Sequence, residues 1–140
     1  MEREIIVKKI ALGHEEIFII NNDLKNLEEK LNDLYALQSN HRTRENDFQR
    51  FLYIEKNKVV ELLNQKNRLK AITKMGEQRN EMLAGIQRQR VESSLTHISE
   101  RLVKEIKEIE DEIEIKQGQI YNLNNQIDDW SYALRRLEMN

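Results

Sequence analysis

The sequence predicts an all-α protein, a long antiparallel two-helix coiled-coil hairpin, and three observations carry this prediction. Charged residues make up 34% of the chain and proline is absent, so the composition suits long helices better than a globular core. Apolar residues recur on a seven-residue rhythm in both halves of the chain, as in a helix packed along another helix. Between the halves the rhythm slips near Gly76, close to the middle of the chain.

The first arm of the hairpin is predicted over about residues 2–73. Steps of four and three residues define nineteen slots from Ile6 to Leu69, of which thirteen are apolar. The polar slots include a cluster from Gln38 to Glu45, where a helix bends or breaks unless its partner supplies polar groups. Two alternatives therefore stay open, a three-helix arrangement with a break near residues 39–43 and a straight parallel oligomer.

The turn is predicted at about residues 74–78 and the second arm at about residues 79–139. Ten apolar slots follow the same alternating steps from Leu102 to Leu137, and only Lys116 interrupts them. The two arms are therefore of nearly equal length, as an antiparallel hairpin requires.

A fold-back at Gly76 also predicts which residues face each other, because facing residue numbers should sum to roughly 152. Ile20 would then face the segment Trp130–Tyr132, and the polar cluster Gln38–Glu45 would lie near Lys116. Such a buried polar layer would fix the register of the two arms.

Enzyme chemistry is not indicated, and we expect no catalytic, cofactor or metal site. The chain has no cysteine, and a zinc-protease motif that could begin at His14 fails because Phe18 stands where its second histidine belongs. The Glu-rich segment 105–114 is interpreted as the solvated flank of a coiled coil. His41 occupies one of the nineteen slots, which would form the contact between the two arms, called here the seam. We favour a partly exposed histidine in a loosened coil over a pH-sensitive switch of the register.

Charge is distributed unevenly along the chain. Residues 42–90 carry a net charge of +6, whereas residues 1–41 carry −3 and residues 91–140 carry −5. The basic residues that would gather at the hairpin tip are Lys66, Arg68, Lys70, Lys74, Arg79, Arg88 and Arg90. We favour a solvated tip, then docking to an acidic protein surface. Nucleic-acid binding is the least favoured, because the cluster lacks interleaved aromatic residues and the whole chain is negative.

Several large apolar residues lie outside the slots, so a seam between two helices cannot bury them. The run Ile17–Ile20 has four apolar residues, of which a seam takes only the first and the last. The predicted partner-binding residues are Ile5, Val7, Phe18, Ile19, Phe51, Tyr53, Trp130 and Tyr132. Because Ile5–Ile20 and Trp130–Leu137 would lie at the open end of the hairpin, this end is predicted to bind a protein partner or to self-associate.

The N-terminal segment lacks the continuous apolar stretch of a signal peptide, and no apolar run approaches the length of a membrane span. The absence of cysteine suits a reducing compartment. We therefore expect a protein without a membrane span that is cytoplasmic, or that is exported by a route without a cleaved signal.

Two near-equal arms, one opened by MEREIIVKKIALGHEEI and the other closed by IDDWSYALRRLE, carry a resemblance to a known family. In this architecture the chain resembles the FliJ/YscO-type central-stalk proteins of flagellar and type III secretion systems. The resemblance spans the whole chain and includes no diagnostic motif. It implies a small cytoplasmic antiparallel coiled coil whose open end inserts into a hexameric ATPase and which escorts export chaperones.

The sequence thus predicts a non-enzymatic structural or interaction coiled coil that docks onto larger protein partners. The resemblance implies that it is a stalk or escort component of a protein-export ATPase complex. A chaperone or adaptor that shields a client helix is the alternative, and a nucleic-acid-associated coiled coil is the least favoured. A salt titration separates these, because phosphate binding weakens steeply with salt and apolar docking does not.

Overall fold

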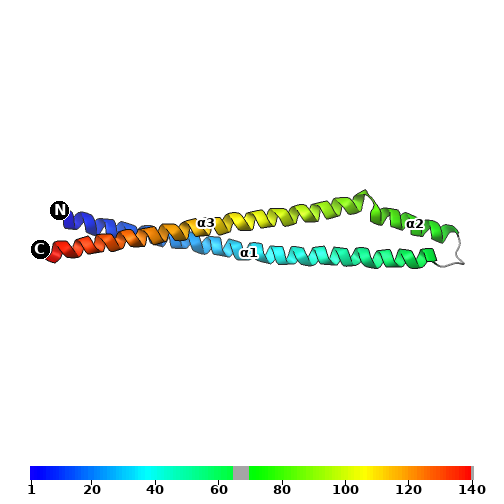
Figure 1. The fold of residues 1–140 in the computed structure, drawn as a ribbon, viewed down its shortest axis with the longest axis horizontal. Coiled ribbons are helices and arrows are strands. Elements are labelled where there is room, and N and C mark those ends of the chain that lie inside the picture. The colour runs from blue at the N-terminus through cyan, green and yellow to red at the C-terminus, as the bar shows by residue number, and fades with distance from the viewer. Residues whose placement is uncertain (65–69, 140) are drawn as a thin grey trace. The chain divides into compact units, whose positions relative to one another are not determined.

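The computed structural model describes residues 1–64 and 70–139, and nearly all of them are helical (Figure 1). Helix α1 spans Glu2–Asn64, α2 spans Lys70–Ala84 and α3 spans Ile86–Met139, with no strand in the described ranges. The predicted all-α fold class is confirmed, with α1 packing against α3 as a hairpin. Among the described helices, none is both long and apolar enough to cross a membrane.

The chain divides into two units, which are described separately. Unit 1 comprises Met1–Leu34 and Glu105–Asn140, so it holds the beginning of α1 and the end of α3. Unit 2 comprises Tyr35–Lys104 and holds the rest of both helices together with α2. Both chain termini belong to unit 1, where Figure 1 shows them next to each other.

Unit 1 is held together by an apolar seam at the predicted positions. Along α1 the slots from Ile6 to Leu34 are buried or half-buried, and every residue between them except Asp23 is exposed. The buried apolar side chains of this unit are Ile20, Leu24, Leu27, Ile106 and Ile127. Asp23 differs because its carboxylate lies 3.6 Å from the Nζ atom of Lys116, the polar seam residue of α3.

Unit 2 keeps the same spacing on α1 but has a more polar seam. Val59 is almost completely buried and packs with Leu52 and Phe48. The remaining seam slots in the described side chains of this part of α1 are polar, namely Gln38, His41, Glu45 and Glu55. All four are at least half-buried, so polar groups lie inside the helix contact of unit 2.

Helix α2 packs against α1 within unit 2. The guanidinium of Arg79 lies 3.5 Å from the Glu55 carboxylate, and Gly76 is buried. Gly85 separates α2 from α3, and its carbonyl oxygen accepts a 3.3 Å hydrogen bond from the Gln89 backbone N–H.

The predicted position of the turn is wrong. Residues 74–78 lie inside α2, and α1 ends at Asn64 instead of near residue 73. A single glycine costs an α-helix only about 1 kcal/mol, which the surrounding helix-forming residues offset, so Gly76 does not end a helix. The connection between α1 and α2 falls on residues 65–69, outside the described part of the chain.

Neither predicted alternative to the hairpin describes the molecule. Helix α1 is continuous through residues 39–43, so the break expected there is wrong. In the described ranges the helical structure is instead interrupted at Gly85, between α2 and α3. Within unit 1, α1 and α3 run antiparallel, since Arg3 pairs with Glu138 at one end and Asp23 with Lys116 farther along. This excludes the straight parallel arrangement.

The predicted register is also wrong. In unit 1 Asp23 lies opposite Lys116 and Gly13 opposite Trp130, so facing residue numbers sum to about 140 instead of roughly 152. The expected pairing of Ile20 with Trp130 therefore does not occur, and Lys116 does not meet the polar cluster of α1. The cause is that α1 already ends at Asn64, earlier in the chain than the turn predicted around Gly76.

Candidate protein-docking surface

The exposed apolar side chains of unit 1 are the strongest candidate for a functional surface in the part of the chain that is described. Five of the predicted partner-binding residues gather in this unit and are exposed, namely Ile5, Val7, Phe18, Ile19 and Tyr132. Phe18 leaves 66% of its surface in water. Several large apolar side chains exposed near one end of a helix pair are typical of a contact surface.

These side chains are exposed because the seam has no place for them. In the run Ile17–Ile20 the first and last residues turn toward α3 and are at least half-buried. Each residue of an α-helix is rotated by about 100° from the one before it. Phe18 and Ile19 therefore point away from the seam, on different sides of α1.

Leu12 is a further exposed apolar residue of this surface, and it was not among the predicted partner-binding residues. Ile5, Leu12 and Ile19 are seven residues apart, and all three are exposed. Since seven residues make almost two turns of helix, the three side chains form one stripe along α1, called here the outer stripe. The repeat of seven outside the seam was the signal that could have revealed Leu12.

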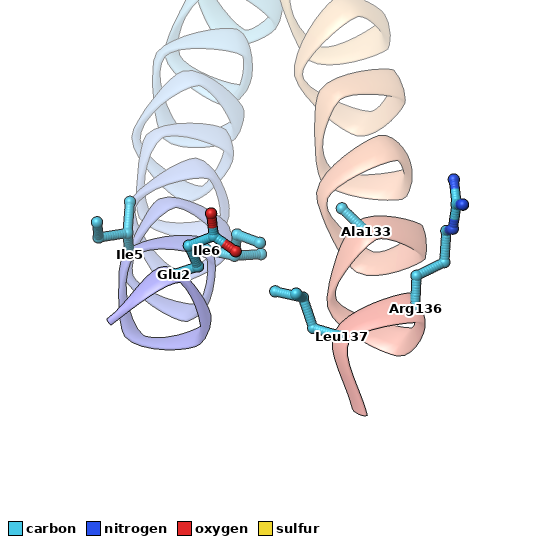
Figure 2. A pocket seen from close by; sticks show the side chains of 6 residues that line it. All are labelled: Glu2, Ile5, Ile6, Ala133, Arg136 and Leu137. Atoms are coloured by element: carbon cyan, nitrogen blue, oxygen red, sulfur yellow. The ribbon is translucent and has the colours of Figure 1, made fainter. Parts of the chain in front are cut away.

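A shallow groove lies between the first turns of α1 and the last turns of α3. Figure 2 shows Ile6 and Leu137 directed toward each other across this groove. The other lining residues are Glu2, Ile5, Ala133 and Arg136. Figure 2 shows the Arg136 side chain on the outer side of α3, so the groove between the helices is mainly apolar, which suits an apolar side chain of a partner.

Two exposed contacts lie in the same turns of α1 and α3 as this groove. Arg3 and Glu138 form a 3.5 Å ion pair, and the Arg136 guanidinium lies 5.9 Å from the centroid of the Tyr132 ring. At exposed sites such contacts are worth about 1 kcal/mol or less. They therefore contribute little to holding the helices together.

Trp130 belongs to the seam more than to the surface. A Cβ atom on Gly13 would lie 3.3 Å from Trp130 Cζ3 and 3.0 Å from Ile127 Cγ1. The absence of a side chain at Gly13 thus lets α3 side chains pack directly on the α1 backbone. Trp130 is half-buried as a result, unlike the five exposed residues predicted with it.

Phe51 and Tyr53, the remaining predicted partner-binding residues, are exposed but belong to unit 2. They precede and follow the buried seam residue Leu52, so both point away from the seam. They are therefore not part of the apolar surface of unit 1.

The predicted basic tip is described only in part. Lys66 and Arg68 lie outside the described residues, and Lys70 is the first residue of α2. Lys74 and Arg90 are exposed. The described residues therefore do not establish one continuous basic surface.

Two arginines of the predicted tip form ion pairs within unit 2. Arg79 lies 3.5 Å from Glu55, and Arg88 lies 3.0 Å from Glu92. These carboxylates offset part of the positive charge. This weakens the argument for phosphate binding, which depends on uncompensated cations.

His41 is buried, so the expectation of a partly exposed histidine in a loosened coil is wrong. Its Nε2 atom lies 2.8 Å from the Leu95 carbonyl oxygen and 2.6 Å from Glu45 Oε1. One N–H group can point at only one of these acceptors, and Glu45 Oε1 has no well-oriented hydrogen bond despite the short contact. We therefore assign the hydrogen bond to Leu95, which connects α1 to α3 within unit 2.

In the described ranges, no group of three or more His, Cys, Asp or Glu side chains is placed to hold a metal ion. His14 and His97 are exposed. The carboxylates of segment 105–114 are exposed apart from the half-buried Glu105, and Lys107 pairs with Asp111 at 3.8 Å. This segment is therefore the solvated flank that the sequence predicts.

Comparison with known proteins adds no assignment to this surface. No protein-family model matches the chain, and no curated protein or solved structure matches it either. The function is therefore inferred from the exposed apolar side chains of unit 1 and from the contacts that they permit.

Proposed function

We propose that this chain is a non-enzymatic interaction protein whose helical hairpin docks onto a larger protein partner through the exposed apolar side chains of unit 1. The exposure of Phe18 is the observation that supports this most strongly. An aromatic side chain turned away from the seam contributes little to the packing of its own unit. Aromatic residues are enriched at the centres of protein interfaces, where their large surface leaves water.

The kind of partner is suggested by the resemblance to FliJ/YscO-type central-stalk proteins. On that reading the end of the hairpin that carries both termini enters the hexameric ATPase of a protein-export complex, and the chain escorts export chaperones. The groove between Ile6 and Leu137 and the exposed Phe18 belong to the unit that this role would engage. A cytoplasmic location is part of the same proposal.

A chaperone or adaptor role is the second candidate, and the groove of unit 1 favours it. Its apolar side chains, Ile6 and Leu137, would receive one apolar side chain of a client helix. In that case the chain would shield an apolar face of its client before assembly. The two candidates use the same unit and differ in the partner that binds to it.

Binding to a purified export ATPase and to export chaperones tests the proposal, with the Phe18→Ser variant compared with the unchanged chain. Burying a phenylalanine contributes about 1.5–3 kcal/mol, so we expect an affinity loss of about 10-fold to 100-fold with unchanged helix content. Ile98→Ser is the matched control, because Ile98 is exposed in unit 2 and outside the predicted partner-binding set. Unfolding of Phe18→Ser, or binding that does not change, would show that Phe18 has no docking role.

A further inference from the structure

We infer that the outer stripe, Ile5, Leu12 and Ile19, is the docking site for a second copy of this chain, placed antiparallel along α1. The three side chains leave 55%, 57% and 53% of their surface exposed. Residues seven apart lie on one face of a helix, so all three side chains can contact one neighbouring helix. Since the seam of unit 1 already uses other positions of α1, this second seven-residue line is available for another helix.

The charges beside the outer stripe identify the partner. Lys8 and Lys9 lie between the first two stripe residues, and Glu15 and Glu16 lie between the last two. All four are exposed, and none forms an ion pair within the described residues. Lys8 and Glu15 each come three residues after a stripe residue, so both lie on one side of the stripe. Lys9 and Glu16 each come four residues after a stripe residue, so both lie on the other side.

This arrangement is complementary to itself under a two-fold axis through Leu12. The axis brings Ile5 opposite Ile19 of the second copy and Leu12 opposite Leu12. In an antiparallel pair each flank meets the same flank of the other helix. Each lysine therefore meets a glutamate of the second copy, Lys8 with Glu15 and Lys9 with Glu16.

A parallel pair in register would place like charges together. The two lysines of one copy would then lie beside the two lysines of the other, and the glutamates likewise. Like-charge contacts of this kind suppress the wrong arrangement. The charge pattern therefore selects the antiparallel second copy, with the apolar stripe as the common contact.

The contact lies at the small end of specific interfaces, because each copy contributes three aliphatic side chains and four charges. The dimer is therefore reversible and depends on concentration. Phe18 precedes Ile19 by one residue and points about 100° away from the stripe, so it stays free for the partner of the proposed function. Ile5 and Ile19 belong to both contacts, so a second copy and the partner would compete for this part of α1, whereas Phe18 belongs to the partner contact alone.

The mass in solution and its response to charge reversal test the inference. The unchanged chain should approach twice 16.8 kDa as its concentration rises toward about 1 mM. Lys8→Glu with Lys9→Glu, and separately Glu15→Lys with Glu16→Lys, should each weaken the dimer by about 10-fold or more. The variant with all four reversals restores every opposite-charge pair, so it should dimerise like the unchanged chain.

Orientation is tested by cross-linking, because the chain contains no cysteine. Copies with Ile5→Cys should form disulfides with copies carrying Ile19→Cys in preference to copies of their own kind. Phe18→Cys is the matched control and should not cross-link to Ile5→Cys. A monomeric mass across the whole concentration range, an unchanged dimer in both charge-reversed variants, or Ile5→Cys copies that cross-link mainly to one another would overturn the inference.

Discussion

Units 1 and 2 use the same seven-residue spacing on α1 but fill it with different chemistry. From Ile6 to Leu34 the α1 slots hold apolar residues apart from Gly13. From Gln38 to Val59 four of the seven slots are polar, so unit 2 buries polar groups where unit 1 buries aliphatic ones. An apolar seam contributes more stability, whereas a polar seam penalises wrong pairings and fixes the register.

The difference shows what each unit should tolerate. Unit 1 depends on burial and close approach, so an added charge or an added side chain in its seam should be costly. Unit 2 depends on polar groups that satisfy each other. Removal of one member of such a pair should therefore lower the free energy of unfolding, whereas replacement of both members by apolar residues should not.

The largest effect is expected for Ile127→Asp in the seam of unit 1. Ile127 is only 6% exposed and packs over Gly13, so the new carboxylate would be buried without a partner. We expect a loss of about 3–5 kcal/mol in the free energy of unfolding, measured by urea denaturation followed by circular dichroism. Ile115→Asp on the exposed side of α3 is the control and should cost less than about 0.5 kcal/mol. Equal losses in the two variants would remove the seam assignment.

Overpacking at Gly13 should cost less. A Cβ atom there would already lie 3.0 Å and 3.1 Å from two atoms of Ile127, so Gly13→Leu forces the helices of unit 1 apart. We expect a loss of about 1–3 kcal/mol in the same urea experiment. Gly118→Leu is the control, because nothing lies within 4 Å of the position of its new Cβ. A Gly13→Leu chain as stable as the Gly118→Leu chain would mean that close approach is not needed.

In unit 2 the corresponding test is His41→Ala, for which we expect a loss of about 1–2 kcal/mol in urea denaturation. The hydrogen bond to the Leu95 carbonyl disappears, and Glu45 keeps a buried oxygen beside an empty space. Replacing both His41 and Glu45 by leucine should restore most of the stability, because an apolar pair leaves no polar group unsatisfied. If the double variant is less stable than His41→Ala, the polar residues of the seam stabilise unit 2 as well as fixing its register.

Much of the fold follows from the spacing of apolar residues. Every predicted α1 slot from Ile6 to Val59 is at least half-buried. Between these two residues, Asp23 is the one residue outside the predicted slots that is also half-buried. Spacing succeeds here because burial of side chains at 3.5-residue intervals is a local property of one helix. The exposed residues of the docking surface followed for the same reason, since they are the apolar residues that the seam leaves out.

Register and the turn could not be predicted in the same way. Sliding one arm along the other by whole heptads keeps apolar slots opposite apolar slots, so the spacing does not determine which residues pair. The prediction relied on Gly76 as the turn, but that glycine lies inside α2. His41 was misjudged for a related reason, because its partner Leu95 offers a backbone carbonyl, which no side-chain pattern reveals.

The smallest effect separates two glycines of unit 1. Gly118→Ala should raise the free energy of unfolding by about 0.5–1 kcal/mol, because alanine favours a helix and the added methyl group meets open space. Gly13→Ala gains the same helix preference but must move Ile127, whose nearest atom would be 3.0 Å away, so its net gain should be smaller or negative. The difference between the two midpoints in urea therefore measures the close contact alone, with the backbone effect removed. Equal gains at both positions would show that Ile127 can shift without loss, and the seam of unit 1 would then be less closely packed than its burial indicates.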